Sequence, residues 1–132
     1  MTPEQFISAW KHSDLNERQG AHIHFNELCE VLGVPKPTGA SLMDHGYGFE
    51  INVNKTGGGG GYADAWKRAC FAWEYKSPGK NLGEALKQLR LYASDLENPP
   101  LLIVSDMRRI ELHTNWTSMV QEKHVLELDD LR

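Results

Sequence analysis

Two carboxylates and one lysine stand at spacings that can bring them to a single point. They are Asp64, Glu74 and Lys76. A β-hairpin with its turn near residues 67–70, centred on Ala69, places Asp64 directly opposite Glu74, with Cβ atoms about 5 Å apart. Glu74 and Lys76 are two residues apart on one strand, so their side chains point to the same face. The other face of that strand is aromatic and is expected to anchor it in a core, through Phe71, Trp73 and Tyr75.

This arrangement predicts a site for a hard divalent cation. Two carboxylates, the backbone carbonyl of Tyr75 and water supply the oxygen ligands that Mg²⁺ prefers, and Mn²⁺ can take its place. Such an ion can polarise a phosphodiester, and Lys76 can orient the attacking water or stabilise developing charge. The alternative interpretation is a cross-strand salt bridge from Lys76 to Asp64 or Glu74 on a solvated face of a sheet. Because these residue types are common, the spacing alone favours the salt bridge.

The surrounding residues extend the pattern Asp-x9-Glu-x-Lys into Gly-Tyr-Ala-Asp-Ala-Trp-Lys and Phe-Ala-Trp-Glu-Tyr-Lys. This resembles the nuclease motif of the PD-(D/E)XK superfamily. More narrowly, it resembles the N-terminal nuclease domain of Mme-type (type IIL, within type IIG) restriction–modification enzymes. Ala63 stands where the superfamily's name has proline, and no candidate ligand is lost. Further matches cover nearly the whole chain: Glu17-Arg18, His24-Phe25, Leu28-Cys29, Leu32-Gly33-Val34-Pro35, Leu86-x-Gln88-Leu89, Asn98-Pro99-Pro100-Leu101-Leu102 and His113-Thr114-Asn115-Trp116-Thr117.

The resemblance implies a Mg²⁺-dependent DNA endonuclease domain, with Asp64, Glu74 and Lys76 as catalytic residues. Asp64, Glu74 and Tyr75 would bind the metal, and the products would carry a 5′-phosphate and a 3′-hydroxyl. The implied fold is α/β, a restriction-endonuclease-like core in which a mixed sheet is flanked by helices. We expect one nuclease domain over 1–132.

Within that domain, the sequence predicts N-terminal helices over 1–34 and a catalytic core over 47–113. The resemblance also implies partners. Double-stranded DNA would be the substrate, and a methyltransferase and a target-recognition domain would follow in the same, longer chain. S-adenosylmethionine would bind only in that methyltransferase domain, which these residues do not include.

Three further residues are candidates for supporting the site. Gln88 and Tyr92 lie four apart on a predicted helix, and Gln-x3-Tyr after Glu-x-Lys is similar to a motif in the RecB-like branch of the superfamily. Glu17 stands near the start of a predicted helix, where the resemblance places a glutamate near the metal, and Glu27 is a weaker alternative. The competing interpretations are a solvated Gln beside a partly buried Tyr, and a Glu that favours the helix dipole.

Charge is distributed unevenly along the sequence. The net charge is −4, which is unusual for a protein that binds DNA alone. Residues 51–90 hold seven Lys or Arg and three Asp or Glu, whereas the segments on either side are acidic. We therefore name Lys67, Arg68 and Lys80 as candidates for contacts with DNA phosphates.

Composition indicates one globular domain. The polar, acidic start Met-Thr-Pro-Glu-Gln is not the pattern expected of a signal peptide, and no apolar run is long enough for a membrane span. We expect a cytoplasmic protein with two free buried thiols, Cys29 and Cys70. His22 and His24 are two apart on a helix and should point in different directions. The glycines at 57–61 lack the Lys-Ser/Thr of a phosphate-binding loop, so a flexible hairpin connection is preferred.

The predicted elements alternate between helices and strands. Helices are expected from Thr2-Pro3, from about Asn16 to Leu32, and from Asn81 to about Leu96, with a loop over 35–46. Strands are expected at 49–53, in the hairpin, at 101–104 and at 110–113, with a last strand or irregular structure at 120–128. Two other functions remain open: a non-catalytic DNA-docking module that keeps the nuclease fold, and a stand-alone structure-selective nuclease.

Overall fold

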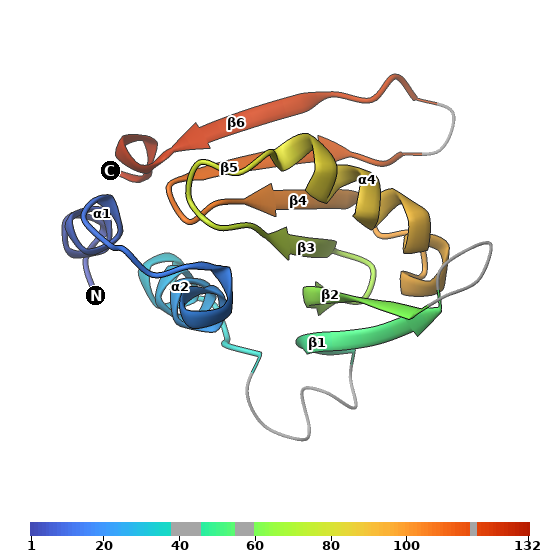
Figure 1. The fold of residues 1–132 in the computed structure, drawn as a ribbon, viewed down its shortest axis with the longest axis horizontal. Helices are drawn as coiled ribbons and strands as arrows, with labels where there is room; N and C mark the ends of the chain where they lie inside the picture. The colour runs from blue at the N-terminus through green and yellow to red at the C-terminus, as the bar shows by residue number, and fades with distance from the viewer. Residues whose placement is uncertain (38–45, 55–59, 117–118) are drawn as a thin grey trace.

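The computed structural model describes residues 1–37, 46–54, 60–116 and 119–132 (Figure 1). Most of the loop expected over 35–46, and most of the glycine run at 57–61, therefore lie outside the described residues.

A six-stranded sheet forms the centre of the molecule, and its strands are ordered in space as they are in sequence. Neighbouring strands are antiparallel except β3 and β4, which are parallel. The sheet is therefore mixed, and with its helices it confirms the predicted α/β class. The strands are β1 (Tyr47–Asn54), β2 (Gly60–Lys67), β3 (Phe71–Tyr75), β4 (Leu101–Ser105), β5 (Arg109–Thr114) and β6 (Lys123–Glu127).

The two N-terminal helices begin where the sequence predicts. In α1 (Pro3–Lys11), Thr2 and Gln5 form a capping box, and in α2 (Glu17–Leu32), Asn16 and Gln19 do the same. Gly33 ends α2 in the left-handed conformation, at φ 70°. Leu32, in the last turn of α2, is 59% exposed.

The third helix, α4 (Leu82–Tyr92), is capped by Asn81 as predicted but ends four residues before the expected Leu96. The chain continues as a 3₁₀ turn, η1 (Ser94–Leu96), in which Leu96 N–H donates to the Ala93 carbonyl at 3.0 Å. Glu97 and Asn98 then adopt positive φ angles of 64° and 44°. The 3₁₀ turn and the positive φ angles of Glu97 and Asn98 therefore end the helix before Pro99 and Pro100.

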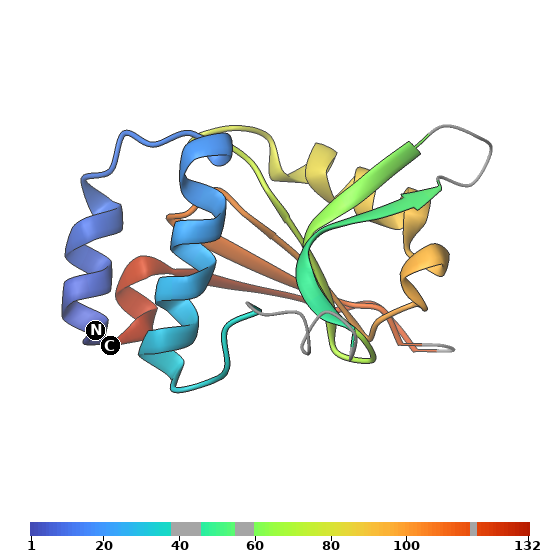
Figure 2. The same cartoon turned by 90° about the horizontal axis from the view of Figure 1, so that it is seen from below.

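The two faces of the sheet pack against different helices (Figure 2). Trp73 and Tyr75 face a core that they share with α1 and α2, as the alternation along β3 predicts. Ala72 faces a second core with α4. Glu74 therefore emerges on the α4 face, flanked by buried residues that hold its strand in place.

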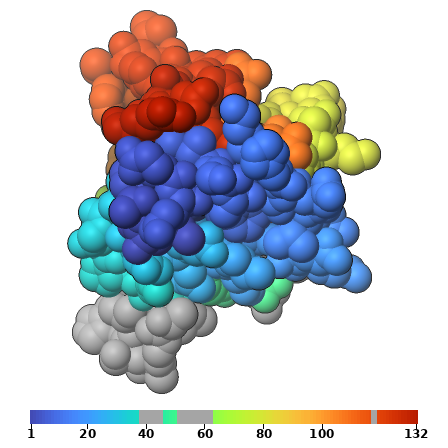
Figure 3. Space-filling model, turned by 90° about the vertical axis from the view of Figure 1, so that its left-hand side faces the viewer, coloured from blue at the N-terminus to red at the C-terminus, as the bar shows by residue number. Residues whose placement is uncertain are grey.

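The two ends of the described chain lie side by side (Figure 3). The C-terminal turn η2 (Leu128–Leu131) packs against α1, and Leu128 and Leu131 contact the core beneath α2. Of the two free thiols, Cys29 is buried as expected. Cys70 is only partly buried, contrary to expectation, because it lies in the β2–β3 turn. Among the described residues, no helix is long and apolar enough to span a membrane.

Candidate active site

The β2–β3 hairpin has the register that the sequence predicts. Ala65 pairs with Trp73 and Lys67 with Phe71, and Ala69 in the turn has a φ of 61°. Carried one residue further, this register sets Asp64 level with Glu74. The two acidic side chains thus approach each other from neighbouring strands on the α4 face of the sheet.

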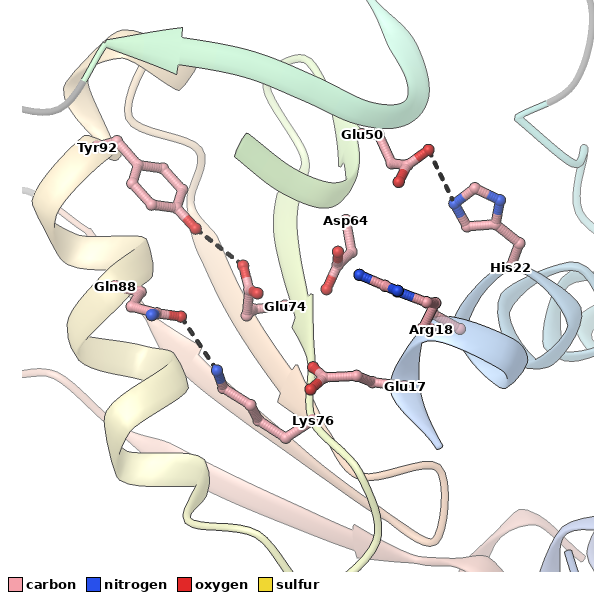
Figure 4. Close-up of a pocket in the computed structure, with 10 residues that line it drawn as sticks. Glu17, Arg18, His22, Glu50, Asp64, Glu74, Lys76, Gln88 and Tyr92 are labelled. Atoms are coloured by element: carbon pink, nitrogen blue, oxygen red, sulfur yellow. Dashed lines mark hydrogen bonds and ion pairs between the residues drawn. The ribbon is translucent and has the colours of Figure 1, made fainter. Parts of the chain in front are cut away.

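Each carboxylate accepts a short hydrogen bond from a neighbouring element. The backbone N–H of Tyr75 donates to Oδ2 of Asp64 at 2.7 Å. The hydroxyl of Tyr92, on α4, donates to Oε2 of Glu74 at 2.8 Å (Figure 4). These bonds fix both carboxylates beside the cavity. They also bring the predicted supporting residue Tyr92 into direct contact with the pair.

The electrostatics of the pair favour an added positive charge. Burial raises the pKa of the Asp64 carboxyl, and the nearby Glu17 and Glu50 raise it further. Burial, followed by repulsion from Asp64, raises the pKa of Glu74 to about 8. At neutral pH the pair therefore tends to retain a proton, unless a cation replaces it.

Lys76 does not form the cross-strand salt bridge that was the alternative interpretation. Its Nζ donates to Oε1 of Gln88 at 3.3 Å, and among the described residues no ion pair joins it to Asp64 or Glu74. Its backbone N–H donates to the Ser105 carbonyl at 2.8 Å, which extends the β3–β4 pairing. Gln88, predicted as a supporting residue, thus holds the ammonium group at the edge of the pocket.

Helix α2 brings its first two turns to the same cavity. The backbone N–H of Glu17 donates to the Ser77 hydroxyl at 3.2 Å, just beyond Lys76. On the core side of α2, Nδ1 of His24 lies 2.8 Å from the Tyr75 hydroxyl, and burial lowers the His24 pKa to about 3. Glu17 lines the cavity as expected, whereas Glu27 turns away and accepts from Trp10 Nε1 at 3.1 Å.

Three ionisable residues at the cavity were not named as site residues from the sequence: Arg18, His22 and Glu50. Glu50 has a φ of 52° within β1, between pairs that set it level with Asp64. His22 Nε2 lies 3.8 Å from Glu50 Oε2, and the His22 ring stacks on Phe49 at 4.0 Å between centroids. The four-residue spacing of Arg18 and His22 on one side of α2 was a signal that could have identified them.

Together these side chains line a pocket of about 590 Å³. Four carboxylates and two permanent cations surround it, which suits a divalent ion together with a phosphate. In the described part of the chain, no three His, Cys, Asp or Glu side chains are arranged to hold a metal by themselves. The lining residues are Glu17, Arg18, Ala21, His22, Glu50, Asp64, Glu74, Lys76, Gln88 and Tyr92.

The three predicted DNA-contact residues lie away from this pocket. Lys67 Nζ sits 5.3 Å above the Tyr47 ring, and Arg68 Nε pairs with Glu97 at 2.7 Å. Lys80 lines a different cavity, at the start of α4. Contacts of these residues with DNA stay a prediction, and any such contacts would be to phosphates outside the pocket.

Comparison with known proteins gives one match over the full length. The family model described as the N-terminal domain of MmeI matches residues 1–132. No match was found among curated proteins. A solved structure titled as a cryo-EM structure of a DrdV–DNA complex is similar with 12% sequence identity and a TM-score of 0.46. The similarity covers 96% of this chain but only 12% of that one.

Proposed function

Because the chain belongs to the family of MmeI N-terminal domains, which are the endonuclease domains of MmeI-type enzymes, we propose that it is a Mg²⁺-dependent DNA endonuclease domain. The observation that carries the proposal is the convergence of Asp64 and Glu74 at one pocket, with Lys76 at its edge. A structural salt bridge does not explain it, since Lys76 is hydrogen-bonded to Gln88 and, among the described residues, forms no ion pair with a carboxylate.

The residues present fit a divalent cation. Asp64 and Glu74 are partly buried beside each other, and burial together with neighbouring carboxylates raises the pKa of both. A bound cation would relieve the repulsion between the Asp64 and Glu74 carboxylates. Asp64 and Glu74 would hold Mg²⁺ or Mn²⁺ with the Tyr75 carbonyl, and the ion would supply Lewis-acid polarisation of the phosphodiester.

The remaining pocket residues would perform the other parts of the reaction. Gln88 Oε1 accepts a hydrogen bond from Lys76 Nζ at 3.3 Å. From this position the Lys76 ammonium can orient the attacking water and stabilise charge on the phosphate. Tyr92 fixes the Glu74 carboxylate through its hydroxyl. Glu17 adds a further negative group beside the pair and can accept a hydrogen bond from water. Attack of the water on phosphorus with cleavage of the P–O3′ bond would leave a 5′-phosphate, and the departing 3′ oxygen would take up a proton to become a 3′-hydroxyl.

We propose that the substrate is double-stranded DNA, bound largely by other domains. The net charge of −4 limits the affinity of these residues for DNA. A methyltransferase domain and a target-recognition domain in the same chain would supply that affinity, and S-adenosylmethionine would bind there. Residues 1–132 would then act as one nuclease domain, with helices over 1–34 and a core over 47–113.

Incubation with supercoiled plasmid tests the proposal. We expect Mg²⁺ or Mn²⁺ to support nicking, EDTA to stop it, and every new 5′ end to be labelled by polynucleotide kinase only after phosphatase treatment. A matched DNA-binding measurement separates the alternatives. A protein that binds DNA but never nicks it, even with its flanking domains present, would be a docking module and not a nuclease.

A further inference from the structure

Arg18 is a cation of the pocket for which the structure, over the residues it describes, gives no hydrogen bond or ion pair. It extends from the first turn of α2, and its guanidinium points toward Asp64 (Figure 4). Within the described part of the chain no hydrogen bond or ion pair reaches it, although Glu17, Glu50 and Asp64 line the same pocket. The other permanent cation of the pocket, Lys76, is engaged by Gln88. Arg18 thus keeps its donors free for a ligand.

The backbone that carries Arg18 is held firmly in position. Asn16 and Gln19 form a capping box at the start of the helix. The backbone N–H of Glu17 donates a hydrogen bond to the hydroxyl of Ser77, which follows β3. Gly20 lets this turn approach the core closely, because a Cβ at that position would lie 2.6 Å from the Met107 sulfur. The base of the Arg18 side chain is therefore fixed relative to the carboxylate pair, and only its own rotamers remain to be ordered by a ligand.

The charge of the pocket indicates which ligand would order the Arg18 side chain. With every carboxylate ionised and His22 neutral, the lining residues carry a formal charge of −2. A divalent ion would bring the pocket to neutrality, and the next anion to enter would be a phosphate of the DNA strand. A guanidinium presents five donors in a planar fork, which matches two oxygens of one phosphate.

We propose that Arg18 binds a phosphate of the cleaved strand, at or next to the scissile position, through two N–H donors. This assignment rests on the proposed nuclease function. It gives the phosphate contact inside the pocket to helix α2, and not to Lys67, Arg68 or Lys80, which lie elsewhere.

Two measurements on Arg18→Ala and Arg18→Lys test the assignment. The first is the salt dependence of binding to a short fluorescein-labelled duplex, with Ca²⁺ in place of Mg²⁺. Loss of one phosphate contact should reduce the slope of log K against log salt by about 0.9 in Arg18→Ala, and Arg18→Lys should restore it. The second is single-turnover cleavage in Mg²⁺. We expect a loss of about 10²-fold in Arg18→Ala, with incomplete recovery in Arg18→Lys because an ammonium cannot form the fork.

Arg132→Ala is the matched control, since Arg132 is an exposed arginine directly after the turn η2 and does not line the pocket. Thermal melts establish that all variants are folded. Arg18→Ala behaving like Arg132→Ala in both assays would overturn the assignment, as would a slower rate with an unchanged salt slope. If the wild-type protein shows no metal-dependent cleavage, the nuclease function fails, and the salt slope alone then decides whether Arg18 binds a DNA phosphate.

Discussion

The backbone N–H of Tyr75 donates to the carboxylate of Asp64 at 2.7 Å, which joins the two strands of the hairpin at the candidate metal site. The hydroxyl of the same tyrosine projects to the opposite face of the sheet and lies 2.8 Å from Nδ1 of His24 on α2. Tyr75 therefore links the carboxylate to the helix that carries Glu17 and Arg18. Tyr75 thus connects the strand side of the pocket, at Asp64, with the α2 side of the pocket.

Replacing Glu74 by Gln should stabilise the metal-free protein at alkaline pH. The folded pKa of Glu74, about 8, exceeds its unfolded value, so the stability that its proton provides is complete below the unfolded pKa and is lost as pH rises toward 8. Glu74→Gln keeps the acceptor for Tyr92 and removes the charge. We expect melts to show no difference near pH 4 and a gain of about 1–3 kcal/mol near pH 8. A gain that is independent of pH would contradict this explanation.

Metal binding should release a proton and therefore tighten with pH. Because the carboxylate pair retains a proton in the free protein, Mn²⁺ must displace it. Calorimetry between pH 6 and 8 should show affinity that rises by up to about tenfold per pH unit, and heats that depend on the ionisation enthalpy of the buffer. The Asp64→Ala, Glu74→Ala double variant is the control, and equal Mn²⁺ binding by the variant and the wild type would refute the site.

Lys76→Ala should impair chemistry without affecting folding. The hydrogen bond to Gln88 is long, at 3.3 Å, and we expect the free energy of unfolding to change by less than about 1 kcal/mol. Loss of charge stabilisation at the phosphate should reduce the cleavage rate by about 10²–10³-fold. Lys11→Ala, which removes an exposed lysine from α1, provides the charge-matched control. Cleavage by Lys76→Ala at the wild-type rate would exclude a catalytic lysine here.

Residues 1–132 alone should cut DNA slowly and without sequence preference. The chain is net acidic, and the described residues hold no helix with base-reading side chains that we can identify. Tethering to a DNA-bound domain would raise the local concentration of the site near its phosphate to roughly millimolar. Plasmid digests by this chain and by a longer form carrying the proposed methyltransferase and target-recognition domains would be compared on a sequencing gel. Discrete, sequence-specific fragments from the shorter form would show that recognition lies within it.

Local sequence signals predicted the parts of the site that depend on short-range geometry. The spacing of Asp64 and Glu74 around Ala69 gave the hairpin register, and the Thr2–Gln5 and Asn16–Gln19 pairs gave the helix starts. Each of these rests on contacts between residues close in sequence, so propensity and spacing determine them.

Glu50 and Arg18 were missed because their positions depend on long-range packing. Glu50 reaches the pocket only through the pairing of β1 with β2, which the composition of residues 49–53 does not specify. Arg18 faces the site because His24 meets Tyr75 and Gly20 meets Met107, contacts that fix the rotation of α2 against the sheet. A helical pattern shows which face is apolar but not which residues stand beside a distant strand.

The most direct test of the metal-binding carboxylate pair is cleavage by Glu74→Gln at pH 8, measured on the same preparation as its melting curve. If Glu74 holds the metal, the variant should be at least as stable as the wild type and yet lose Mg²⁺-dependent cleavage by about 10²-fold or more. Thermal stability would then be kept or raised while the cleavage rate falls, which a purely structural role for Glu74 does not explain. Cleavage at the wild-type rate by this folded variant would contradict the assignment.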